Sequence, residues 1–434
     1  MRASIFIESI HLDIHLSCSH CFYYLINTFS WKSIIIIVLS FFLTGCISEF
    51  SPVISNDKGF IIIDARLSDK EGAVVKLSKI NKGETRNYPW DVKANIEITD
   101  NFGEKIVLTQ RSSGVYWSDQ NGIPGHSYIL SVKTSEGKEY VTSPEVLYPV
   151  QSIDSVYGVF ELHTTLNSKI KKPGIAFYVE FNTEENLCQY LRWTWDETWV
   201  EKVPYEWRYF GKYNESGDLV SIETWPLEED STGHNRKCYY YNSSNQIAIE
   251  STAQFKPWFS EKKLLLFVDD LPGRLSAGYS IEIQQHSLTY NAFLYYKQLQ
   301  QYNELSGSLY DPIPSSIESN IHDTDNPMQK ITGYFVVSSI TRKRIFIKPG
   351  DIIPDQYRMP DTTIVCTDSI TGKYAVASRI HRYSSNVDIY DIIPQDSTVD
   401  RPLEIRMTNK LCFDCTEKGG STKKPQYWND YYSK

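Results

Sequence analysis

Short segments in which apolar and polar residues alternate place the strongest constraint on how this chain folds. Between residues 92 and 99 the apolar side chains stand at every second position, which is typical of a strand with one buried face. A turn at 100–103 and a second apolar alternation at 106–108 indicate a hairpin. Further short strands are indicated, without helical periodicity among them, at 59–67, 115–117, 128–132 and 140–141. The pattern predicts an Ig-like β-sandwich over residues 58–148.

Strand-like segments resume after Pro149 and predict a larger β-rich, sandwich-like domain over residues 149–348. Its expected strands lie at 174–181, 190–195, 264–268, 279–283, 331–337 and 344–347. Residues 349–434 show fewer regular patterns, and we expect a loop-rich, cysteine-containing C-terminal region that packs on the second domain. The predicted fold class is therefore mainly β.

One helix is predicted inside the second domain, near residues 288–305. Leu288, Ala292, Tyr295 and Leu299 recur at steps of four and three residues, which places them on one face of a helix. Ser287 is the expected N-cap, and a glycine at 307 is the expected stop.

Composition agrees with a strand-rich protein and argues against one class of partner. Aromatic residues make up 14% of the chain, with 30 Tyr and only 4 Met, and aromatic side chains pack well on pleated sheets. The net charge of −9 comes without a basic run, so we expect no nucleic-acid partner.

The apolar run at residues 33–43 follows Lys32 and ends in Leu-Thr-Gly-Cys at 43–46. It is too short for a membrane-spanning helix, which needs about 20 residues, but it suits the apolar part of a signal peptide. Its end resembles the bacterial lipobox, which predicts cleavage before Cys46, lipidation of that cysteine and a tether over 46–57. The alternative is a short core strand that ends in Gly-Cys.

Residues 1–45 then form the signal peptide together with an upstream extension that is too long for its charged part. We expect translation to begin nearer Leu25, with a start codon other than Met. Cys18 and Cys21 would in that case not be made, and by themselves they lack the second pair of ligands that a structural zinc site needs.

The densest aromatic cluster contains Trp193, Trp195, Trp199 and Trp207. Aromatic faces stack on sugar rings, so these residues are candidates for a ligand-binding platform. Alternation also sets Trp193 and Trp195 on one face of a strand, as core packing requires. Both interpretations stay open.

Cys412 and Cys415 are candidates for a redox pair, half of a metal site or a structural disulfide. A thioredoxin-type pair needs a βαβ context that is missing here, and zinc needs two further ligands. A disulfide, either within the pair or to Cys366 or Cys238, suits an oxidising compartment. Because an odd number of cysteines remains after Cys46, at least one thiol stays unpaired if all pairing is internal.

Motifs of common enzyme classes are missing from the sequence. We find no H-E-x-x-H, G-x-S-x-G or P-loop pattern, so we expect no enzyme, no cofactor and no metal site. Asp323, Asp325 and Asn326 resemble the start of a calcium loop, but Met328 replaces the glycine that such a loop requires. Glycosidases need only two carboxylates close in space, so a glycan-active enzyme remains an alternative.

Several motifs together resemble the Bacteroidetes lipoproteins of the domain-of-unknown-function 4249 family, over about residues 46–430. They are the lipobox, Gly-Ile-Pro-Gly at 122–125, Ile-Asp-Ser-Val-Tyr at 153–157, the helix run at 290–299, Leu-Tyr-Asp-Pro-Ile-Pro at 309–314, and the tail with Cys412, Cys415, the glycines at 419–420 and Trp428.

The resemblance implies an outer-membrane lipoprotein without an established activity, often encoded beside a TonB-dependent receptor. We therefore expect a protein held by its N-terminal lipid on the periplasmic or cell-surface face of the outer membrane. Its expected role is that of an accessory or ligand-binding component of nutrient uptake, with a TonB-dependent receptor as partner and a glycan or peptide as ligand. A structural or adhesive surface protein is the main alternative.

Overall fold

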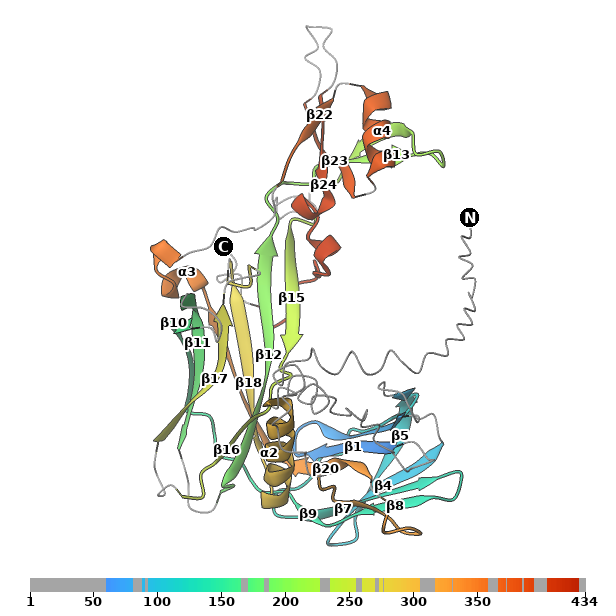
Figure 1. Ribbon diagram of the computed structural model, residues 1–434, viewed down its shortest axis with the longest axis vertical. Helices are drawn as coiled ribbons and strands as arrows, with labels where there is room; N and C mark the ends of the chain where they lie inside the picture. Colours follow the sequence, from blue (N-terminus) through green and yellow to red (C-terminus); the bar gives the residue numbers. More distant parts are fainter. Residues whose placement is uncertain are drawn as a thin grey trace, which may run out of the picture. The chain divides into compact units, whose positions relative to one another are not determined.

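The computed structural model of the protein is mainly β, which confirms the predicted fold class (Figure 1). It describes residues 60–80, 88–89, 93–164, 171–182, 187–226, 235–254, 260–269, 273–275, 277–304, 317–329, 331–357, 366–371, 373–384, 386–393 and 404–428. The predicted signal peptide at 1–45, Cys46 and the tether at 46–57 lie outside these residues. Within the described ranges, no helix combines the length and the apolar character needed to cross a membrane.

A first set of eleven described strands is linked by hydrogen bonds around one core. Its members are β1 (Phe60–Ser68), β2 (Gly72–Ile80), β3 (Tyr88–Pro89), β4 (Ala94–Asp100), β5 (Lys105–Ser112), β6 (Val115–Ser118), β7 (Ser127–Thr134), β8 (Glu139–Thr142), β9 (Glu145–Val146), β19 (Ile321–Asp323) and β20 (Thr332–Ser338).

Strand β5 lets these strands form two layers, because it pairs with β4 at its start and with β6 at its end. The register shifts between Gln110 and Ser112, and such a bulge bends a strand so that it can pass from one sheet to the other. Alternate residues of both layers point inward, among them Ile63, Leu67 and Ile98, which are fully buried. The first region is therefore a sandwich closed along one side.

The last strand of this sandwich comes from far along the chain. Residues 331–337 are predicted to belong to the second domain, but β20 lies parallel to β1, with Ile62 opposite Thr332 and Ser68 opposite Ser338. Phe335 belongs to the core of the first sandwich, while Tyr334 packs in a separate cluster with the helix at 290–304. Burial on both faces explains the continuous apolar run of this strand, which is typical of parallel pairing.

A second sandwich follows, in which a three-stranded sheet packs on a five-stranded one. The first sheet contains β10 (Ser155–Thr164), β11 (Lys171–Asn182) and β17 (Ser260–Asp269), and the second contains β12 (Tyr190–Lys202), β15 (Lys237–Ser243), β16 (Ala248–Ser251), β18 (Tyr279–Ser287) and β21 (Ile340–Ile347). Phe177 and Phe181 of β11 meet Trp193 of β12 and Tyr279 of β18 in the shared core.

The predicted helix is α2 (Tyr290–Glu304), which packs against β12, β16 and β20. Its N-cap is Thr289, because the Thr289 hydroxyl oxygen accepts the Ala292 N–H at 3.1 Å. Ser287, the predicted cap, instead donates its hydroxyl proton to the Tyr148 carbonyl at 2.7 Å. The helix thus begins two residues later than expected, and the predicted stop at Gly307 lies outside the described residues.

The C-terminal region contains more regular structure than predicted. Its elements, together with one hairpin from earlier in the chain, are α3 (Pro349–Ile352), η1 (Asp355–Tyr357), β22 (Ser369–Thr371), α4 (Tyr374–Tyr383), β23 (Val387–Ile393), β24 (Glu404–Asn409), η2 (Lys410–Cys412), η3 (Cys415–Lys418) and the hairpin β13 (Tyr209–Tyr213) and β14 (Leu219–Thr224). Strands β22, β24 and β23 form a sheet that packs with α4 and the hairpin around Leu219, Ala377 and Met407. We call β13, β14, β22, β23, β24 and α4 the C-terminal lobe.

A buried carboxylate connects the two sandwiches. Glu145 is only 2% exposed and accepts hydrogen bonds from the Tyr334 hydroxyl at 2.6 Å, the Thr289 hydroxyl at 2.5 Å and the Asn320 amide at 3.2 Å. Burial raises the pKa of the Glu145 carboxyl, and the three hydrogen bonds only partly oppose this rise. Glu145 therefore links the two sandwiches by hydrogen bonds, and the free energy that burial of its carboxylate costs depends on pH.

Glycine at position 333 is required by the parallel pairing of β1 and β20. Gly333 has φ +111°, and a Cβ added there would fall on the backbone oxygen of Ile63. We predict that Gly333→Ala lowers the free energy of unfolding by about 2–4 kcal/mol, because it adds a clash to an unfavourable backbone conformation. Urea denaturation followed by tryptophan fluorescence measures the change.

The matched control is Gly137→Ala, in the turn between β7 and β8. Gly137 also has positive φ, at +83°, but a Cβ there would meet nothing within 4 Å. We expect this variant to lose only about 1–2 kcal/mol, from backbone strain alone. Equal losses for the two variants would contradict the close approach of β20 to β1.

The raised pKa of Glu145 predicts that folding becomes less favourable as pH rises. The folded state binds this proton more tightly than the unfolded chain, whose carboxyl titrates near the ordinary value of 4.5. The stabilisation that the bound proton gives is thus complete below that value and is lost as pH rises toward the folded pKa.

Urea denaturation of the wild type and of Glu145→Gln, at about pH 4 and about pH 7, tests this. The wild type is expected to lose stability relative to Glu145→Gln at the higher pH, and parallel profiles would refute the prediction. Glu139→Gln, an exposed change nearby, serves as control.

Candidate functional site

The four candidate cysteines form two disulfides, which confirms that they serve as structural disulfide cysteines. Cys238 bonds to Cys415, and Cys366 bonds to Cys412, with Cα separations of 5.7 and 5.9 Å. Cys412 and Cys415 therefore bind different partners and do not form a pair with each other. Among the described cysteines Cys188 alone is unpaired, and it is buried. One thiol was expected to remain free.

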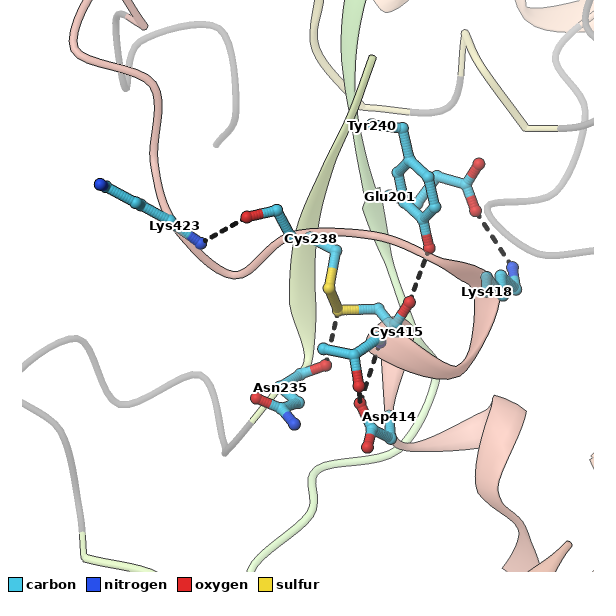
Figure 2. Close-up of a disulfide and its surroundings, with 10 residues drawn as sticks. Glu201, Asn235, Cys238, Tyr240, Asp414, Cys415, Lys418 and Lys423 are labelled. Carbon is cyan, nitrogen blue, oxygen red and sulfur yellow. Dashed lines mark hydrogen bonds and ion pairs between the residues drawn. A yellow bond between two sulfur atoms is a disulfide. The ribbon is translucent and has the colours of Figure 1, made fainter. Parts of the chain in front are cut away.

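The Cys238–Cys415 disulfide attaches the tail to strand β15 (Figure 2). The Cys415 N–H donates to the Asn235 carbonyl at 3.0 Å, and the Tyr240 hydroxyl donates to the Cys415 carbonyl at 2.9 Å. Lys418, one turn further along, pairs with Glu201 at 3.0 Å. Since both cysteines are fully buried, this contact is part of the folded core and not a surface crosslink.

The Cys366–Cys412 disulfide closes the C-terminal lobe on itself, because it joins the residue ahead of β22 to the turn that follows β24. The Cys412 carbonyl also accepts the Tyr205 N–H at 3.0 Å. The segment between β12 and β13 is thus held against the same turn.

A pocket of about 330 Å³ opens between that segment and the C-terminal lobe. It is lined by Pro204, Tyr205, Glu206, Arg208, Arg236, Asp368, Tyr390, Asp391 and Arg406. Arg236 lies two residues before Cys238, and Asp368 lies two residues after Cys366. Both disulfides therefore anchor walls of this pocket.

Two stacked tyrosines form the aromatic wall of the pocket. The rings of Tyr205 and Tyr390 lie 4.9 Å apart at 14°, and the Tyr390 hydroxyl donates to Asp368 at 3.0 Å. Burial, followed by the hydrogen bond to the Asp368 carboxylate, raises the pKa of Tyr390. Burial and the same carboxylate raise the pKa of Tyr205. Both rings are therefore neutral at physiological pH and serve for stacking and hydrogen bonding.

Three arginines and three carboxylates form the polar part of the pocket. Glu206 holds two of the arginines, since Arg208 donates from Nε at 2.7 Å and Arg236 donates from Nη1 at 3.0 Å. The third, Arg406, stands beside Asp391 on the neighbouring strand, with 3.8 Å between Nη1 and Oδ2. This arrangement suits recognition of a polar ligand by hydrogen bonds.

The four candidate tryptophans do not form a common platform. Trp193 and Trp195 are 0% and 2% exposed in the core of the second sandwich, so the platform interpretation is wrong for them and the packing alternative holds. Trp199 stacks on Tyr240 and donates to Glu201. Trp207 packs against Phe413 and donates to the Ile389 carbonyl at 3.1 Å. Trp199 thus packs beside the tail, and Trp207 packs beside the strand that carries Tyr390.

Sequence reasoning missed the residues that line the pocket, although two signals pointed toward them. Tyr205 belongs to the aromatic-rich segment that the sequence singles out. Arg236 and Asp368 each lie two residues from a predicted disulfide cysteine. The partners on β23 and β24 carry no local signal, because they meet the other wall only through the fold.

Comparison with known proteins identifies the family of the chain. Residues 47–344 match the family described as Domain of unknown function (DUF4249). The chain belongs to this family. No curated protein matches it. In this DUF4249 chain the match ends within β21, so both disulfide partners in the tail, and the pocket residues on β23 and β24, lie beyond the matched range.

The part of the DUF4249 chain that the structure describes contains no cluster of three or more metal-ligating side chains. The calcium-like loop is held by its own backbone, because Asp323 accepts the N–H groups of Asp325 and Asn326 at 2.9 and 3.1 Å. This is an ordinary turn stabilised by an aspartate side chain.

The disulfides predict how the C-terminal lobe responds to loss of a crosslink. Cys366 and Cys412 are 46 residues apart, and their bond restricts the unfolded lobe. Replacing both by serine is expected to lower the local stability of β22–β24 by about 2–4 kcal/mol. Hydrogen exchange of the backbone amides in these strands measures it.

Cys188→Ser is the matched control, because its thiol makes no disulfide and donates to the carbonyls of Tyr190 and Leu288. Serine keeps this donor, so exchange in the lobe should not change. Unaltered exchange in the double variant would show that the lobe is stable without its crosslink.

Proposed function

We propose that this DUF4249 protein is a lipid-anchored, extracytoplasmic ligand-binding protein of the outer membrane of a Bacteroidetes bacterium. In this proposal it serves as an accessory to a TonB-dependent receptor in nutrient uptake, and it binds its ligand without turning it over. The observation that carries the proposal is the open polar pocket whose walls are held by two disulfides.

The disulfides support the location, because such bonds persist in oxidising compartments outside the cytoplasm. Four of the five cysteines after Cys46 are used in this way, and the fifth is buried. The family match supports the lipid anchor, since it begins at residue 47, directly after the cysteine of the lipobox. Lipoproteins processed at this position carry more than one acyl chain, which is sufficient for stable anchoring.

The pocket supports ligand binding over a purely structural or adhesive role. It combines an aromatic wall, Tyr205 and Tyr390, with convergent arginine and carboxylate side chains. Six of the nine lining residues are charged, and convergent polar groups beside aromatic rings can fix the orientation of a small polar ligand. A spacer or adhesive surface has no need for this arrangement.

Affinity capture from detergent-solubilised outer membranes of the native host tests the proposal. The acylated protein is expected to retain one TonB-dependent receptor at near-equal abundance by mass spectrometry. Cys46→Ser should lose both the acyl group, detected with an alkyne-labelled fatty acid, and the receptor. Cys188→Ser is the control, because this buried, unpaired cysteine lies after the lipobox and its loss should change neither result.

Capture of no receptor by a correctly acylated protein would contradict the accessory role and favour the structural or adhesive alternative. Normal acylation of Cys46→Ser would contradict the proposed anchor.

A further inference from the structure

The geometry points to a ligand for the pocket: we propose that it binds a carboxylate group and that Arg406 recognises this group directly. The inference rests on the proposed ligand-binding function and specifies its ligand chemistry.

Arg406 is the pocket arginine whose hydrogen-bonding capacity is unused. Its Nε is buried and has no hydrogen-bond partner among the described residues. Its nearest carboxylate, Asp391, stands 3.8 Å away, beyond hydrogen-bond distance. A guanidinium has five N–H donors, and a buried donor without an acceptor is costly. Its side chain is 35% exposed, so a ligand in the pocket can reach the outer Nη groups of the guanidinium, while the buried Nε stays out of reach.

The other charged groups of the pocket, apart from Asp391, already make hydrogen bonds. Arg208 and Arg236 both donate to Glu206, and Arg236 also donates from Nε to the Val203 carbonyl at 3.2 Å. Asp368 accepts the hydroxyl of Tyr390. Asp391 stands beside Arg406, so the donors that remain for a ligand are those of Arg406, and they favour a group that accepts hydrogen bonds.

The balance of charges favours an anion with a single charge. The lining contains three arginines but also Glu206, Asp368 and Asp391, so the formal charges of the lining cancel and a dianion such as phosphate would add two uncompensated charges. A carboxylate carries one charge, and its two oxygens match the planar fork of a guanidinium.

The surroundings of Arg406 accommodate the rest of such a ligand. Ile370 stands opposite Arg406 on β22 and is 60% exposed. The stacked rings of Tyr205 and Tyr390 form the facing wall. These surfaces suit a flat or apolar body attached to the carboxylate, as in the uronic acid of a glycan or the C-terminal residue of a peptide. Both sources present the same chemistry.

Two pairs of probes distinguish the sources in calorimetric titrations of the full-length, detergent-solubilised protein. The first pair is trigalacturonic acid and its methyl ester, and the second is the tripeptide Ala-Ala-Phe and its C-terminal amide. The acid of at least one pair is expected to bind at least about tenfold more tightly than its neutral partner. The pair that shows this preference identifies the source.

Arg406→Gln is expected to remove the preference for the acid, and Arg406→Lys should restore only part of it, because lysine keeps the charge without the fork. Arg382→Gln is the matched control, since Arg382 lies on α4 of the same lobe, outside the pocket, and pairs with Asp218 at 3.4 Å. It should bind as the wild type does. An unchanged thermal midpoint in each variant shows that the lobe is folded.

Equal binding of acid and neutral probes, binding of neither acid, or an unchanged preference in Arg406→Gln would overturn the inference. These outcomes are independent of receptor capture. A protein that captures a receptor but shows no preference for carboxylates contradicts only the ligand class. A protein that prefers carboxylates but captures no receptor contradicts only the accessory role.

Discussion

The direct connection from strand β20 to strand β21, which leads from the first sandwich into the second, is the constraint on which the other parts of the structure depend. Strand β20 completes the first sandwich and β21 belongs to the second, and Ser339 is the one residue between them. Because this junction is buried, its backbone groups need partners inside the protein. The Ser339 N–H donates to the Ser287 hydroxyl at 2.8 Å, and the Ile340 N–H donates to Asp69 at 2.9 Å. The direction of β21, and with it the order of β18 and β12, follows from this junction.

The C-terminal lobe is stabilised in a different way. Its core is small, and its hairpin at 209–224 is separated in sequence from the sheet that it packs on by more than a hundred residues. Ordering such distant segments costs loop entropy, which crosslinks reduce in the unfolded chain. The same crosslinks hold Arg236 and Asp368 in place, so the stability of the lobe and the geometry of the pocket depend on the same bonds.

Local patterns predicted the individual strands well, whereas distant pairings were not predictable. Alternation placed β4 within two residues of its observed start, and the apolar stripe found α2. The parallel partner of β1 was missed, because β20 lies some 270 residues later and an apolar run does not name its partner. The four disulfide cysteines were recognised by type, but their pairing depends on the fold. For the same reason Trp193 was ambiguous from sequence, and Arg406 could not be singled out at all.

The net charge of the chain bears on how the proposed carboxylate site would work. A protein with a charge of −9 does not attract anions over long distances, and at physiological salt such effects extend only about 8 Å. Recognition in the proposed pocket must then come from short-range hydrogen bonds, which require a guanidinium that is already positioned. The strands on either side, β22 and β23, hold the backbone of β24 at Arg406. Binding of this kind is modest in strength, but a lipid anchor beside a receptor raises the effective concentration of captured ligand. The proposed anchor and the proposed pocket therefore complement each other, because neither strong affinity nor electrostatic steering is needed when the site stays close to its receptor.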